Sequence, residues 1–175
     1  MTNETNQLTV LDNQTGEIIQ SNGNVVRETN KHVVMLNEKG KYIRKAKYEE
    51  YSSMTFETRE DKIFLAQLFG QDNENDENSL KNNIGKEFEL ANVITRPYSS
   101  IDEDTGEEIH GVITYLFTPE KEVFITSSKT VYFTLFENYF KLFGRPDYEE
   151  YENLKVKVTS RRGTNGTILD LKLIG

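Results

Sequence analysis

The chain of 175 residues is long enough for one hydrophobic core with extensions and short for two independent domains. It has no cysteine, which excludes disulfides. No run of about 18 apolar residues occurs, which excludes a membrane helix, and the N-terminus does not resemble a signal peptide. A cytoplasmic protein is therefore expected. The net charge of −8 argues against a polyanionic partner. The charge is uneven, however: residues 71–80 and 101–110 are acidic, whereas 39–47 and 153–175 are basic, so local fields decide where a polyanion docks.

Residues 1–50 are predicted to be a flexible N-terminal arm, because its first part is rich in Asn, Thr, Gln and Glu. A weak hairpin can form where 9–11 and 17–19 flank a turn-like sequence. A better hairpin is predicted over 32–45. Basic and aromatic residues alternate near the end of the arm, which suits either single-stranded DNA or a neighbouring subunit: Tyr42, Arg44, Lys45 and Lys47.

Residues 51–175 are predicted to form one domain that begins with a helix over 56–70. Three strands follow. The first alternates from Phe88 and ends at Pro97, which cannot donate to a ladder. The second spans 111–118 and the third 122–126.

A strongly apolar helix is predicted over 131–143, with Ser128 or Thr130 as its N-terminal cap. Two strands, 154–158 and 169–173, alternate apolar with polar residues and flank a hairpin turn over 161–166.

Three strands, a helix and two strands is the element order of an OB fold. We therefore predict a mainly β protein with helices (α+β): a five-stranded OB-type barrel with a helix between strands 3 and 4, plus an N-terminal extension. Other small α+β folds stay open, because strand order cannot be read directly from the sequence.

Catalytic chemistry finds little support. Only two histidines occur, His32 and His110, and no Gly-rich loop precedes a helix. The spacing of Asp102 and Asp104 is partly like that of a calcium loop, but the twelfth-position Glu is missing, so a solvated loop is favoured. Ser127-Ser128-Lys129 places hydroxyls beside an amine, which a helix cap explains more simply than a nucleophile. We expect no enzyme, no cofactor and no metal.

Single strands bind where aromatic platforms accompany a basic groove, and each stacked base contributes about 1–3 kcal/mol. For Tyr115, a role as a stacking platform and a place in the hydrophobic core are equally favoured. For Phe117, a place in the core is favoured. On the fourth predicted strand, Lys155 and Lys157 share the outer face, where lysines are often only solvated. Arg161 and Arg162 follow and extend them into a basic patch. The candidate nucleic-acid contacts are Arg96, Tyr98, Tyr115, Phe117, Ser127, Lys129, Lys155, Lys157, Arg161 and Arg162.

Several strings carry a family likeness: residues 93–98, 104–107, 113–117, 124–129 and 144–146. Together they resemble the single-stranded DNA-binding proteins of phages and conjugative plasmids of Gram-positive bacteria, over roughly residues 56–175. The resemblance implies an OB fold, sequence-tolerant binding of single-stranded DNA, and a role in replication or conjugative transfer.

We further expect a homo-oligomer or filament on DNA, with the arm contacting the next subunit, and replication or transfer proteins as additional candidate partners. The alternative is an acidic protein-binding module of a mobile element, whose acidic loops would mimic DNA. A metal-dependent enzyme that uses His110 and the acidic loop is the remote third class.

Overall fold

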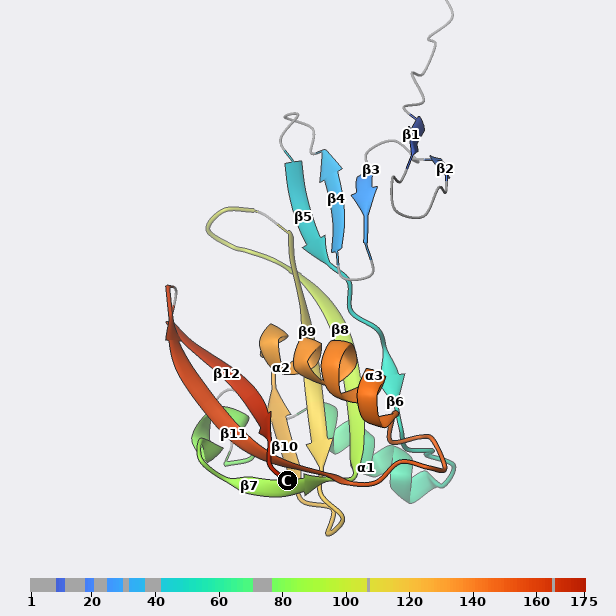
Figure 1. Ribbon diagram of the computed structural model, residues 1–175, viewed down its shortest axis with the longest axis vertical. Coiled ribbons are helices and arrows are strands. Elements are labelled where there is room, and N and C mark those ends of the chain that lie inside the picture. Colours follow the sequence, from blue (N-terminus) through green and yellow to red (C-terminus); the bar gives the residue numbers. More distant parts are fainter. Residues whose placement is uncertain are drawn as a thin grey trace, which may run out of the picture. The chain divides into compact units, whose positions relative to one another are not determined.

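The computed structural model describes residues 9–11, 18–20, 25–29, 32–36, 42–70, 77–106, 108–164 and 166–175. The chain divides into two compact units, Met1–Tyr48 and Glu49–Gly175 (Figure 1).

The first unit consists of short antiparallel strands. β1 (Thr9–Leu11) pairs with β2 (Ile18–Gln20), and β3 (Val25–Glu28), β4 (His32–Leu36) and β5 (Tyr42–Ala46) form a sheet in that order. The predicted hairpin over 32–45 is confirmed, because β4 pairs antiparallel with β5. The sequence did not predict β3.

The turns predicted for both hairpins, over 12–16 and 37–40, lie outside the described residues. So does most of the acidic stretch 71–80.

The second unit contains two antiparallel sheets. In the first, β10 (Val123–Thr126), β9 (Glu108–Phe117), β8 (Asn92–Ile101) and β6 (Tyr51–Ser52) lie in that order. β8 and β9 form a long hairpin because ten residues of each strand pair in continuous register.

In the second sheet, β12 (Gly166–Leu173) pairs with β11 (Leu154–Gly163), which pairs with β7 (Glu87–Leu90). Only Ala91 separates β7 from β8, so one bent segment contributes a strand to each sheet.

The protein is thus mainly β with helices, as the sequence predicts. The expected barrel is not closed, because the described strands include no pairing between β10 and β12.

α1 and the long apolar helix begin at side-chain caps. In α1 (Arg59–Phe69), Thr58 and Asp61 form a reciprocal capping box. The long apolar helix consists of α2 (Lys129–Phe133), a π-helical turn η2 (Thr134–Tyr139) and α3 (Phe140–Phe143). Ser128 caps its start by accepting from the backbone N–H of Val131.

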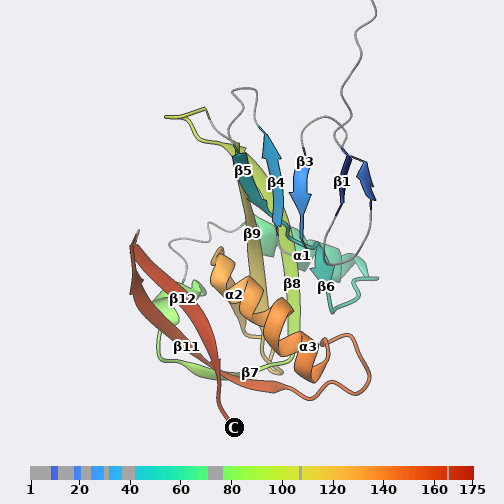
Figure 2. The same cartoon turned by 45° about the horizontal axis from the view of Figure 1, so that its top comes forward.

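This helix covers the free edge of β12. Ser128 Oγ donates to the carbonyl of Leu169 at 2.9 Å, and Tyr139 Oη donates to that of Leu171 at 2.7 Å. The backbone N–H of Leu173 donates to the same tyrosine oxygen at 2.9 Å. Figures 1 and 2 show the helix crossing β8 and β9 beside the β11–β12 hairpin.

The other face of the β8–β9–β10 sheet is covered by α1. Leu68 of α1 shares a buried cluster with Tyr115, Phe117 and Ile125, and the rings of Phe69 and Tyr115 lie 5.3 Å apart. Every residue of β10 is therefore buried. A sheet covered on both faces loses the polar–apolar alternation that the sequence analysis relied on.

Pro97 does not end its strand, contrary to the prediction. β8 continues through Pro97 to Ile101. β6 pairs with β8 only at Ile94 and Thr95, so one edge of β8 is free at Pro97 and a residue without an N–H is tolerated there.

We expect stability to fall steeply in alkali. Burial raises the pKa of the Tyr151 hydroxyl to about 12, and burial also raises the pKa of Tyr51 and Tyr139. The fold favours the neutral phenols, so this stability is fully present below the ordinary tyrosine pKa of about 10 and is lost as the pH rises toward 12 and above. Urea unfolding between pH 8 and 12 measures this loss. In Tyr151→Phe the decline should be shallower, and an equally steep decline would contradict the assignment.

Candidate nucleic-acid interface

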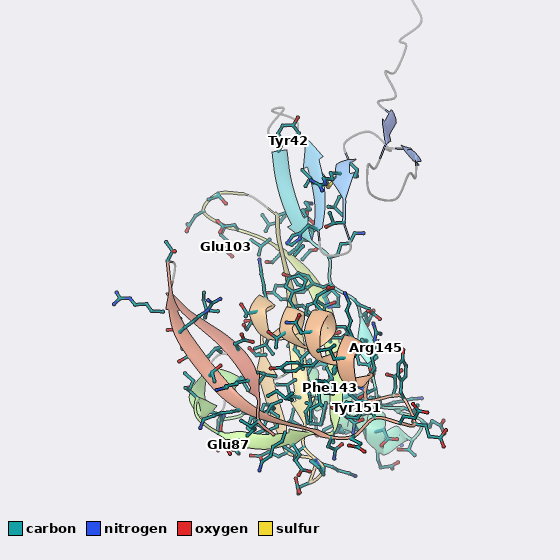
Figure 3. All side chains as sticks on the ribbon, viewed as in Figure 1. Tyr42, Glu87, Glu103, Phe143, Arg145 and Tyr151 are labelled. Atoms are coloured by element: carbon teal, nitrogen blue, oxygen red, sulfur yellow. The ribbon has the colours of Figure 1, made fainter. Side chains whose placement is uncertain are left out.

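The basic residues of β11 fall into two groups. Lys155 and Lys157 lie opposite Glu89 and Glu87 of β7, and Lys157 Nζ lies 3.1 Å from Glu87 Oε1 (Figure 3 labels Glu87). Arg161 and Arg162 lie beyond the last residue that pairs with β7. A phosphate would have to compete with a carboxylate for Lys157.

The two arginines are strand residues, although the sequence predicted a turn there. β11 runs to Gly163 and β12 starts at Gly166, so Arg161 pairs with Ile168 and Arg162 with Thr167. Both arginines are exposed, and neither has an ion-pair partner within the described residues.

The pleat places the two arginines on opposite faces of the hairpin. Leu154, Val156 and Val158 point into the core, so Arg162 continues the core-side face and Arg161 the outer face. The strand therefore places Arg161 and Arg162 on different faces, so they do not form one continuous patch.

A second cluster lies on β8. The guanidinium of Arg96 stacks over the ring of Phe69 at 4.0 Å, which holds the side chain against α1. Tyr98 is 40% exposed and pairs with Gly111 of β9. A Cβ at Gly111 would lie 2.3 Å from the Tyr98 ring, so the ring lies directly over this glycine. Gly111 could not be predicted from the sequence, because only the strand register brings it to Tyr98.

The assignment of Tyr115 and Phe117 as nucleic-acid contacts needs correction. Their exposed fractions are 0% and 2%, because α1 covers the sheet face on which they lie. A ring without exposed surface offers no platform to a base. Both residues are core residues of this structure.

Ser127 and Lys129 line a pocket of about 440 Å³ between the start of α2, β12 and the 3₁₀ helix η1 (Leu80–Asn83). Both side chains are exposed. The pocket also contains Lys81 and several further hydroxyl groups.

The tip of the β8–β9 hairpin is acidic. Asp102 Oδ1 accepts from the backbone N–H groups of Thr105 and Asp104 at 2.8 and 3.0 Å, and these bonds, that to Thr105 foremost, lower the pKa of the Asp102 carboxyl. The carboxylate therefore stays charged, and Figure 3 labels Glu103 on the same loop. A phosphate chain is repelled by this tip.

In the first unit Tyr42 is 71% exposed, whereas Lys45 and Lys47 are half-buried (Figure 3 labels Tyr42). The side chain of Arg44 lies outside the described residues. Among the described side chains of this set, only that of Tyr42 is mostly exposed.

Within the described ranges, no group of three or more His, Asp or Glu side chains is arranged to hold a metal ion. Nor does this part of the chain contain a helix whose length and hydropathy suit a bilayer span.

An antiparallel fold that exposes cations on a strand hairpin is typical of a binding protein. The chain is 36% identical, over 167 residues, to a single-stranded DNA-binding protein of Bacillus phage GA-1, and the match covers 94% of this chain and 97% of that relative. No family model and no solved structure matches.

At this identity over nearly the whole length, the chain belongs to the phage single-stranded DNA-binding protein family. Membership agrees with the resemblance seen in the sequence and with the prediction of a binding protein rather than an enzyme.

Proposed function

We propose that this chain binds single-stranded DNA without strong sequence preference, through the β11–β12 hairpin and the outer part of β8. The observation that carries the proposal is that Arg161 and Arg162 are exposed and have no ion-pair partner among the described residues, in an acidic protein that belongs to this family. Arginines that neutralise phosphates release counterions, which supplies most of the affinity of sequence-tolerant binding.

The fold supports an OB-like interpretation in an open form. One sheet has the order β12–β11–β7 and the other continues it as β8–β9–β10, because β7 and β8 are joined at Ala91. A five-stranded OB barrel would have this strand order if it were opened between β10 and β12. The helix between β10 and β11 covers the β12 edge at that cut.

A binding assay with fluorescent dT oligonucleotide and a duplex of equal length tests the proposal across a salt series. The expected result is tight binding to dT that weakens with salt, and weaker binding to duplex. Absence of binding to dT, combined with capture of a replication protein, would favour the alternative of an acidic protein-binding module that mimics DNA.

Tyr98 is proposed as the exposed stacking platform. We expect Tyr98→Ala to weaken dT binding by about 1–3 kcal/mol. Gly111→Ala should have a similar effect because its new methyl group displaces the Tyr98 ring. The double variant should be no weaker than Tyr98→Ala alone, and additive losses in dT titrations would contradict the coupling of the two positions.

The arm is proposed to contact the next subunit, so that copies assemble along DNA during replication or conjugative transfer. Deleting residues 1–30 should lower the cooperativity of coating long single strands while single-site affinity for short dT is kept. Unchanged cooperativity, measured from binding isotherms on long and short strands, would contradict this role.

A further inference from the structure

The cut between β10 and β12 contains a pocket of about 440 Å³ whose lining is unusual for an acidic protein. It carries hydroxyl side chains from three segments, together with Lys81 and Lys129, and none of the described residues that line it carries a carboxylate. The chain as a whole has 29 acidic residues against 21 lysines and arginines, so the local composition reverses the overall charge.

The pocket exists because the facing edges of β10 and β12 do not pair with each other. The edge of β10 is occupied by the segment before η1: Ile125 N donates to the carbonyl of Asn78, and Ser79 bridges Ile125 in parallel. The edge of β12 is held by Ser128, which donates to the carbonyl of Leu169. These contacts fix the walls.

Both pocket lysines are available to a ligand. Their side chains are exposed, and within the described residues neither ammonium has an ion-pair partner. Other cations of this unit are paired: Lys86 with Glu122, Lys141 with Glu137 and Arg145 with Glu49.

Each arginine of the hairpin pairs across the ladder with a residue that lines this pocket. Thr167 and Ile168 contribute to its lining, and their partners on β11 are Arg162 and Arg161. Cross-strand partners are neighbours on one face of a ladder. Arg162 and Thr167 share the core-side face, so a polyanion held by Arg162 is brought to the pocket mouth.

We propose that this pocket is a phosphodiester-binding site, in which Lys81 and Lys129 neutralise backbone phosphates of single-stranded DNA and the surrounding hydroxyls donate to phosphate oxygens. The proposal rests on the proposed function. Ammonium and hydroxyl groups are donors suited to phosphate, and they carry no information on base identity.

The test is the double variant Lys81→Ala/Lys129→Ala in a salt-titrated dT binding assay. Loss of two phosphate contacts should make the slope of log affinity against log salt shallower by about 1.4 and reduce affinity about 25-fold at about 0.1 M salt. The matched control is Lys62→Ala/Lys141→Ala, which removes the same charge outside the pocket and should leave the slope unchanged.

A second measurement needs no variant. In the wild-type protein, amine acetylation of Lys81 and Lys129 should be suppressed by saturating dT, while that of Lys62 and Lys141 should continue. If wild type does not bind dT at all, the proposed function itself fails. If wild type binds dT but the slope is unchanged by the pocket variant, or the pocket lysines stay reactive, the pocket assignment alone is overturned.

Discussion

Replacing Phe117 by alanine is expected to lower the free energy of unfolding by about 3–5 kcal/mol, the usual cost of removing a buried aromatic ring from a packed core. Phe117 is 2% exposed and lies in the cluster with Leu68 and Ile125 between α1 and the sheet. Urea unfolding followed by circular dichroism measures the change.

The matched control is Leu142→Ala, because Leu142 is an apolar residue that is 75% exposed and should change stability by no more than about 0.5 kcal/mol. If Phe117→Ala kept its stability and instead lost affinity for dT, the ring would be a stacking platform after all. Phe117 would then contact DNA rather than belong to the core.

The double variant Arg161→Ala/Arg162→Ala is expected to bind dT about 25-fold more weakly at about 0.1 M salt, with a salt slope shallower by about 1.4. Both side chains are exposed beyond the segment that pairs with β7, so stability should change little. Fluorescence anisotropy with labelled dT over a salt series measures both quantities.

Arg59→Ala/Lys62→Ala is the control, since it removes the same charge from the exposed side of α1. The single variants add information because the arginines lie on opposite faces of the hairpin. A loss confined to Arg162→Ala would place the DNA on the core-side face, next to the pocket. Equal binding by wild type and the double variant would remove the hairpin from the interface.

Local pattern was enough to predict several elements. Alternation in 154–158 and 169–173 indicates the β11–β12 hairpin, and the spacing of Val131, Leu135 and Phe136 indicates the long helix. These signals are local because strand and helix periods are set by the backbone itself. The predicted cap, Ser128, follows from the same local chemistry.

What failed depends on contacts between distant segments. Tyr115 follows the same alternation whether its face meets solvent or a helix, and only the packing of α1 decides the outcome. The proximity of Gly111 to Tyr98 requires the register of β8 and β9. The hydroxyl-rich pocket requires three segments to meet at an unpaired seam, and no single stretch of sequence encodes that.

The covering of the β12 edge has a consequence for the protein at high concentration. Exposed strand edges recruit strands from other chains and seed aggregation. Here the backbone groups of Leu169, Leu171 and Leu173 already bond to Ser128 and Tyr139. Copies crowded together therefore find these three backbone groups already bonded, and Tyr139→Phe should make the protein more prone to aggregate as its concentration rises.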